Sequence, residues 1–120
     1  MSNRFQDRGF VQLGSSPSAP VYVIITPTTA ANSAISVIAS ANATTTILAA
    51  NSNRVGATIY NNANKTMYLA LAAGATNLNF TVALDSNGSY YEVPSNYTGI
   101  ITGYWPAGVT GSAYATELTP

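Results

Sequence analysis

Few side chains in this chain of 120 residues have the chemistry that catalysis or metal binding uses. The chain has no histidine and no cysteine, so it lacks the commonest general base, the thiol nucleophile and the usual zinc ligands. Its four carboxylates are Asp7, Asp85, Glu92 and Glu117. Glu92 and Glu117 could in principle form the carboxylate pair of a glycosidase. The alternative, which we favour, is that each pairs with a basic side chain such as Arg54 or Lys65, or faces water.

Metal, nucleic-acid and membrane partners are not expected either. Calcium needs several clustered oxygen ligands, and residues 85–87 supply too few. Four basic and four acidic residues cancel to a net charge of zero, whereas nucleic-acid binding requires clustered Lys and Arg. The longest strongly apolar run, residues 21–25, is far shorter than the roughly 20 residues of a membrane-spanning helix. We therefore expect no enzyme activity, no metal and no cofactor.

The charged fraction of the chain is unusually small. It is 7%, against about 25% in typical soluble proteins. The exposed surface must therefore be built mainly from Asn, Thr, Ser, Gly, Ala and Tyr, and such a surface loses little free energy when another protein covers it. A small domain without disulfides or metals also often gains stability by oligomerising. This composition predicts a surface that is covered by other proteins.

Alternating apolar residues and turn signals predict an all-β fold. In residues 54–61, for example, Val55, Ala57 and Ile59 fall on one face and Thr58 and Tyr60 on the other. No helix fits between the segments, so the strands should be antiparallel. Strands recurring about every ten residues are typical of a β-sandwich or barrel-like domain of about eight short strands. The expected strands are 35–39, 44–49, 54–61, 67–71, 77–84, 89–93, 98–105 and 112–118.

Two segments of this pattern need separate comment. Residues 28–50 are rich in Ala and Thr and also fit a helix, but their β-branched residues favour two short strands. The strand at 77–84 should point its apolar side chains inward, namely Leu78, Phe80, Val82 and Leu84. The Asn87-Gly88 pair that follows accepts positive φ at both positions and predicts a β-hairpin into residues 89–93.

Residues 1–27 differ from the remainder and predict an extended N-terminal arm, with the sandwich domain at 28–120. Pro17 and Pro20 lie among small residues and disfavour a helix. The arm ends in five residues of high β-propensity, Val21, Tyr22, Val23, Ile24 and Ile25. This segment is either the first strand of the chain's own sheet or a strand that adds to a neighbouring subunit's sheet edge. Both hold if the arm is exchanged between subunits.

Five stretches of the chain form a recognisable series. They are RVGATIYNN at 54–62, MYL at 67–69, YYEVP at 90–94, YTGIITGYW at 97–105 and GSAYATEL at 111–118. The series resembles a domain of small structural proteins of tailed bacteriophages, including capsid cement (decoration) proteins of the cyanophage type. The resemblance covers roughly residues 45–118 and is a pattern of strands and turns rather than a chemical signature.

The resemblance implies a role and a location. The chain would be made in the cytoplasm of a bacterial host and would bind the outer surface of the capsid, where it stabilises the shell of major capsid protein. A homo-oligomer is expected, with a trimer favoured over a dimer. One alternative is a tail, fibre or baseplate component of the virion. A second alternative is a carbohydrate-binding module, because tyrosine and tryptophan also stack on sugars.

Candidate partner-binding residues follow from these expectations. Arg4 and Arg8 would meet acidic groups on the shell, and the segment 21–25 would add a strand. Aromatic residues are favoured anchors of protein interfaces. The complete predicted set is Arg4, Arg8, Val21, Tyr22, Val23, Ile24, Ile25, Tyr91, Tyr104 and Trp105.

Overall fold

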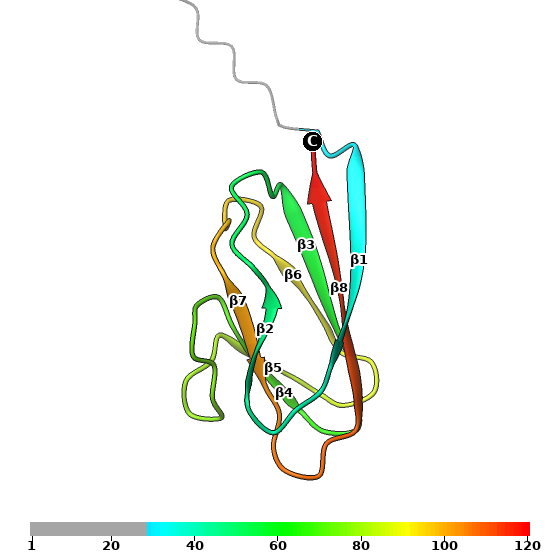
Figure 1. The fold of residues 1–120 in the computed structure, drawn as a ribbon, viewed down its shortest axis with the longest axis vertical. Helices are drawn as coiled ribbons and strands as arrows, with labels where there is room; N and C mark the ends of the chain where they lie inside the picture. Colours follow the sequence, from blue (N-terminus) through cyan, green and yellow to red (C-terminus); the bar gives the residue numbers. More distant parts are fainter. Residues whose placement is uncertain (1–28) are drawn as a thin grey trace, which may run out of the picture.

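Two four-stranded antiparallel sheets face each other in the computed structural model, which describes residues 29–120 (Figure 1). Sheet A has the strand order β1-β8-β3-β6 and sheet B the order β2-β7-β4-β5. The strands are β1 (Asn32–Ala39), β2 (Thr44–Leu48), β3 (Gly56–Ala63), β4 (Met67–Ala70), β5 (Val82–Leu84), β6 (Tyr90–Val93), β7 (Ile101–Tyr104) and β8 (Gly111–Thr119). The prediction of an antiparallel all-β domain of about eight short strands is confirmed. The predicted arm, residues 1–27, lies outside the described residues.

The core lies between the two sheets and is built by the alternation that the sequence shows. Ala57 and Ile59 of β3 point inward, as predicted, and face Met67 and Leu69 of β4 across the sandwich. Trp105, just after β7, belongs to the same core, and none of it is exposed. Burial of these apolar side chains supplies the main driving force for packing one sheet on the other.

Two buried polar side chains connect the sheets. Arg54, just before β3, pairs with Glu117 of β8 at 2.8 Å and donates to the carbonyl oxygens of Ala49 (2.6 Å) and Gly99 (2.9 Å). Ala49 follows β2 and Gly99 precedes β7, so this guanidinium ties sheet A to sheet B. The predicted pairing of Glu117 with a basic side chain is thereby confirmed.

Asn61 in β3 forms the second polar link. Its Oδ1 accepts a hydrogen bond from the indole N–H of Trp105 at 3.2 Å, and its Nδ2 donates to the carbonyl of Leu84 at 3.0 Å. A buried amide without such partners would destabilise the fold by about 1–3 kcal/mol. Here the amide instead fixes β3 against the ends of β5 and β7.

The segment 77–84 differs from its prediction. The strand begins only at Val82, and Leu78 is 90% exposed instead of pointing inward. Phe80 also lies largely outside the core, whereas Val82 and Leu84 face it as predicted. The reason is that residues 71–81 form a loop that passes over the outer side of sheet B, held there by backbone and side-chain hydrogen bonds.

The predicted turn at Asn87-Gly88 exists, but it does not close a hairpin. Asn87 and Gly88 both have positive φ, 57° and 136°. However, β5 pairs with β4 in sheet B, whereas β6 pairs with β3 in sheet A. The backbone N–H of Gly88 already donates to the carbonyl of Asn61 in β3. The turn therefore carries the chain from one sheet to the other, and the hairpin prediction is wrong.

Candidate protein-binding face

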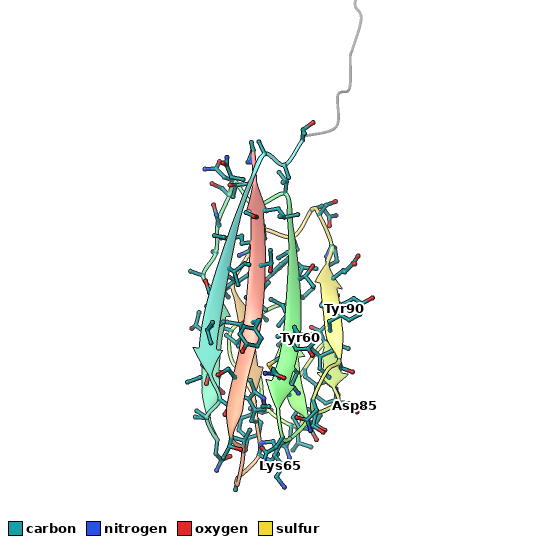
Figure 2. The ribbon with its side chains drawn as sticks, turned by 90° about the vertical axis from the view of Figure 1, so that its right-hand side faces the viewer. Tyr60, Lys65, Asp85 and Tyr90 are labelled. Carbon is teal, nitrogen blue, oxygen red and sulfur yellow. The ribbon has the colours of Figure 1, made fainter. Side chains whose placement is uncertain are left out.

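The outer face of sheet A presents a continuous row of large side chains across four strands. Strand register places Val37 opposite Tyr114, Tyr114 opposite Tyr60, and Tyr60 opposite Tyr90. One row further along, the register aligns Ile35 with three residues of the neighbouring strands, Thr116, Thr58 and Glu92. These eight residues define the outer face of sheet A. Figure 2 views the molecule from this side, with Tyr60 and Tyr90 close together on β3 and β6.

This face is exposed to a degree that is unusual for its residue types. Ile35 is 71% exposed, Val37 63% and Tyr90 61%. The ring centroids of Tyr60 and Tyr114 lie 6.1 Å apart, and both side chains are still open to solvent. Among the eight residues only Glu92 is charged. Contiguous exposed apolar area of this kind marks an interaction site more often than a free surface.

Alternation along each strand explains how the face arises. In β8, Ala113 and Ala115 point into the core while Tyr114 points out. In β1 the same pleat directs Ile35 and Val37 outward, opposite Thr116 and Tyr114. In the middle of β8 the two small residues Ala113 and Ala115 therefore face the core, while the large ring of Tyr114 between them lies on the outer side. The predicted set of partner-binding residues did not include Ile35, Val37, Tyr60 or Tyr114.

The outer face of sheet B is arranged differently. The loop 71–81 lies over it, and Thr102 of β7 is buried beneath that loop. The Thr102 hydroxyl donates to the carbonyl of Ala72 at 2.6 Å and accepts from the N–H of Ala75 at 3.1 Å. The ring of Tyr68 in β4 packs against Phe80 of this loop and Tyr104 of β7, with ring centroids 5.0 Å and 6.4 Å away. The aromatic trio of sheet B, as we call these three residues, is the second cluster of surface aromatics.

The structure distributes the predicted partner-binding residues over three environments. Tyr104 is half-buried in the aromatic trio of sheet B. Tyr91 packs against the core because it shares the inner side of β6 with Val93, so its neighbour Tyr90 is the outward tyrosine. Trp105 is fully buried and we withdraw it from the candidate interface. Arg4, Arg8 and the segment Val21, Tyr22, Val23, Ile24 and Ile25 lie outside the described residues.

The two strand glutamates do not share a site. Glu92 lies on the outer face of sheet A, opposite Thr58, whereas Glu117 lies on the inner side, opposite Ala57, and pairs with Arg54. Because the two carboxylates lie on opposite faces of sheet A and Glu117 is paired with Arg54, they do not form a dyad that acts on one substrate. Within residues 29–120, no group of three or more acidic, His or Cys side chains is placed to hold a metal ion. The same residues include no helix of the length and apolarity that a membrane crossing requires.

No protein-family model, curated protein or solved structure matches this chain. A role for the outer face of sheet A therefore has to be argued from the chemistry of the face. Its residues can bury area, stack and donate phenolic hydrogen bonds, which are the properties of a protein-binding surface.

Proposed function

We propose that the chain is a non-enzymatic structural protein of a bacteriophage virion, a capsid cement protein that binds the assembled major capsid protein shell from outside. The observation that carries the proposal is the outer face of sheet A, a row of tyrosines and β-branched residues with a single carboxylate. The partner is named from the strand-and-turn pattern of residues 45–118, which resembles that of phage structural proteins. The low charge of the chain favours association with a partner.

The size of the face fits this role. Four strands about 4.8 Å apart, each contributing two outward residues that occupy about 6.8 Å of strand apiece, give a patch of roughly 260 Å². A standard interface buries about 800 Å² per partner, so one copy would bind with modest affinity. A cement protein acts in many copies on a repetitive shell, and contacts made together are far stronger than each contact alone. Modest single-copy affinity is therefore what the function requires.

Binding to shells depleted of the protein tests the proposal. The double variant Tyr60→Ser, Tyr90→Ser removes two rings from the outer face of sheet A. It should weaken the affinity for capsids, measured by co-sedimentation, at least thirtyfold, because the loss of even one aromatic anchor of about 2 kcal/mol corresponds to a factor of about 30. The matched control, Leu78→Ser with Phe80→Ser, removes two exposed apolar side chains on the other side of the molecule. It should bind like the unmodified protein.

Two results would contradict the proposal. The first is an unmodified protein that fails to sediment with capsids. The second is equal binding by the two double variants. Copy number separates the cement role from the tail, fibre or baseplate alternative. A cement protein should be present at a number comparable to the shell subunit, whereas a tail component would be present in a few copies and would bind purified tails.

The aromatic trio of sheet B favours a second candidate function, a carbohydrate-binding module. Tyr68 lies between Phe80 and Tyr104, and partly exposed aromatic rings of this kind can stack on sugar rings. A glycan array with the isolated protein tests this. Tyr68→Ala should abolish any glycan affinity while Tyr90→Ala leaves it intact. Trp105→Ala is unsuitable for the test because Trp105 is a core residue.

A further inference from the structure

The four edge strands of the sandwich differ in how open they are to pairing. A sheet edge exposes unpaired N–H and C=O groups, and proteins protect edges with short strands, bulges, prolines and charges. In sheet B, β5 has three residues and β2 contains a register shift between Thr46 and Leu48. In sheet A, β6 has four residues, carries Glu92 and ends before Pro94. Each of these three edges has at least one protective feature.

Strand β1 has none of these features. It has eight residues, NSAISVIA, with no charge and no proline, and it pairs with β8 in unbroken register over its whole length. Its partner among the described strands is β8 alone, so no strand of residues 29–120 pairs with its other edge, which Figure 1 shows at the side of the molecule. Seven of its eight residues are exposed and Ile38 is half-buried. Sheet B therefore leaves most of this strand uncovered on both faces.

The ladder fixes which backbone groups point to the free edge. The N–H of Ser40 donates to the carbonyl of Gly111, and hydrogen-bonded pairs alternate along an antiparallel ladder. The backbone N–H and C=O groups of even-numbered residues of β1 therefore bond to β8. Those of odd-numbered residues point away from β8, toward the free edge. The outward set is Ser33, Ile35, Val37 and Ala39.

We propose that the free edge of β1 pairs antiparallel with β1 of a second copy of this chain, about a two-fold axis at Ser36. In this register Ile35 lies opposite Val37 of the second copy, and Ser33 lies opposite Ala39. All four outward-directed residues of each strand then find a hydrogen-bonding partner. The two sheets A join into one continuous eight-stranded sheet, and their outer faces become one surface.

A second copy is the occupant that the strand itself favours. The outward set is self-complementary, because reversing the strand about Ser36 maps the four positions onto one another. No like charges meet, since β1 has no charged residue. Two-fold pairing of identical surfaces is also the commonest form of homo-oligomer. The proposed pairing of two β1 strands gives a dimer instead of the expected trimer. This proposal does not depend on whether a capsid binds the outer face of sheet A.

The pairing buries less area than a standard interface. An edge contact of one strand per copy falls at the low end of interface sizes, below about 1,200 Å² in total, where association is weak and transient. We expect dissociation constants in the micromolar range or above. Solution measurements should therefore span concentrations from about 10 µM to about 500 µM.

A single cysteine placed at the axis tests the register. The chain has no cysteine, so any disulfide comes from the introduced residue. Ser36 faces its copy as a non-hydrogen-bonded pair, with Cα atoms about 4.5 Å apart, inside the range of disulfide bonds. The Ser36→Cys protein should form a disulfide-linked dimer under mild oxidation. The matched control is Ser33→Cys, also exposed on β1, whose two copies would lie six residues apart, about 20 Å, and should not link.

A proline at the free edge tests the hydrogen bonding. The N–H of Val37 points away from β8, so Val37→Pro keeps the fold's own ladder while removing a donor from each copy. Sedimentation equilibrium should show at least a tenfold weaker dimer. Val23→Pro in the N-terminal arm should leave the dimer unchanged.

Three outcomes would overturn the proposal. In the first, Ser33→Cys links as readily as Ser36→Cys, or neither variant links at about 500 µM. In the second, the full chain remains a monomer at that concentration. In the third, Val23→Pro abolishes the dimer as effectively as Val37→Pro, which would make residues 21–25 the strand that occupies the edge. None of these measurements contains capsids, so a failure here is distinct from a failure of the cement assignment.

Discussion

The outer faces of sheets A and B are both built on four antiparallel strands, but they differ in how far the described residues cover them. Sheet B is covered by the chain's own loop 71–81, which buries Thr102 under a pair of hydrogen bonds. Sheet A presents Ile35, Val37 and Tyr90 to solvent with no such cover from the described residues. Among the described residues, a loop therefore covers the outer face of sheet B but not that of sheet A. The uncovered face is the one that we assign to partners.

The largest expected effect comes from removing the link between the two sheets. Arg54→Met deletes the guanidinium that bonds Glu117 of sheet A and carbonyls next to sheet B strands. It should lower the free energy of unfolding by about 3 kcal/mol, because carbonyl acceptors and a carboxylate lose their partner. Glu117 still reaches some solvent, which keeps the loss near the lower end of the range for buried pairs. Urea denaturation measures it.

The control for Arg54→Met is Lys65→Met, which removes a basic side chain from an exposed position. Its unfolding free energy should stay within about 0.5 kcal/mol of the unmodified protein. Equal midpoints for the two variants would show that Arg54 does not connect the sheets.

A matched pair of threonine substitutions compares the two faces directly. Thr102→Val on sheet B removes the hydroxyl that bonds Ala72 and Ala75, and should cost about 1–3 kcal/mol because buried backbone groups lose their partners. Thr116→Val makes the same change on the outer face of sheet A and should alter stability by less than about 0.5 kcal/mol. Thermal unfolding of both proteins provides the measurement. If Thr116→Val were the more damaging change, the two faces would have been assigned the wrong way round.

The smallest expected effect sharpens the comparison. Tyr90→Ser on the outer face of sheet A should change the unfolding free energy of the free protein by less than about 0.5 kcal/mol, because the ring is mostly in solvent. The same change should weaken capsid binding. A large loss of stability in the free protein would mean that Tyr90 serves the fold rather than a partner.

Much of the fold could be predicted because its signals are local. Alternation fixed the inward residues of β3, and turn chemistry placed the break at Asn87-Gly88. What that turn connects depends on which strands pair, and pairing is decided by contacts between residues far apart in the sequence. The overextended strand at 77–84 has the same cause. Its apolar alternation runs on into residues whose backbone is bonded as a loop over sheet B.

The sequence predicts a surface poor in charge but does not predict which residues form the candidate face. Low charge predicted a surface to be covered, but choosing its residues required knowing which side of each strand is inner. For Tyr90 and Tyr91 a signal was present, because Val93 shares a strand face with Tyr91 and marks that face as the inner one. Trp105 likewise continues the inward positions 101 and 103 of β7. For Ile35 and Val37 no local signal exists, since β1 is apolar yet lies beyond the cover of sheet B.

Hydroxyl-radical footprinting of the free and capsid-bound protein tests the central claim most directly. It compares the oxidation rates of exposed side chains on the two sides of one molecule. We predict that Tyr90 and Val37 become protected on the capsid while Leu78 and Phe80 keep their reactivity. Protection of Leu78 and Phe80 with Tyr90 unchanged would contradict the assignment of the outer face of sheet A to partners.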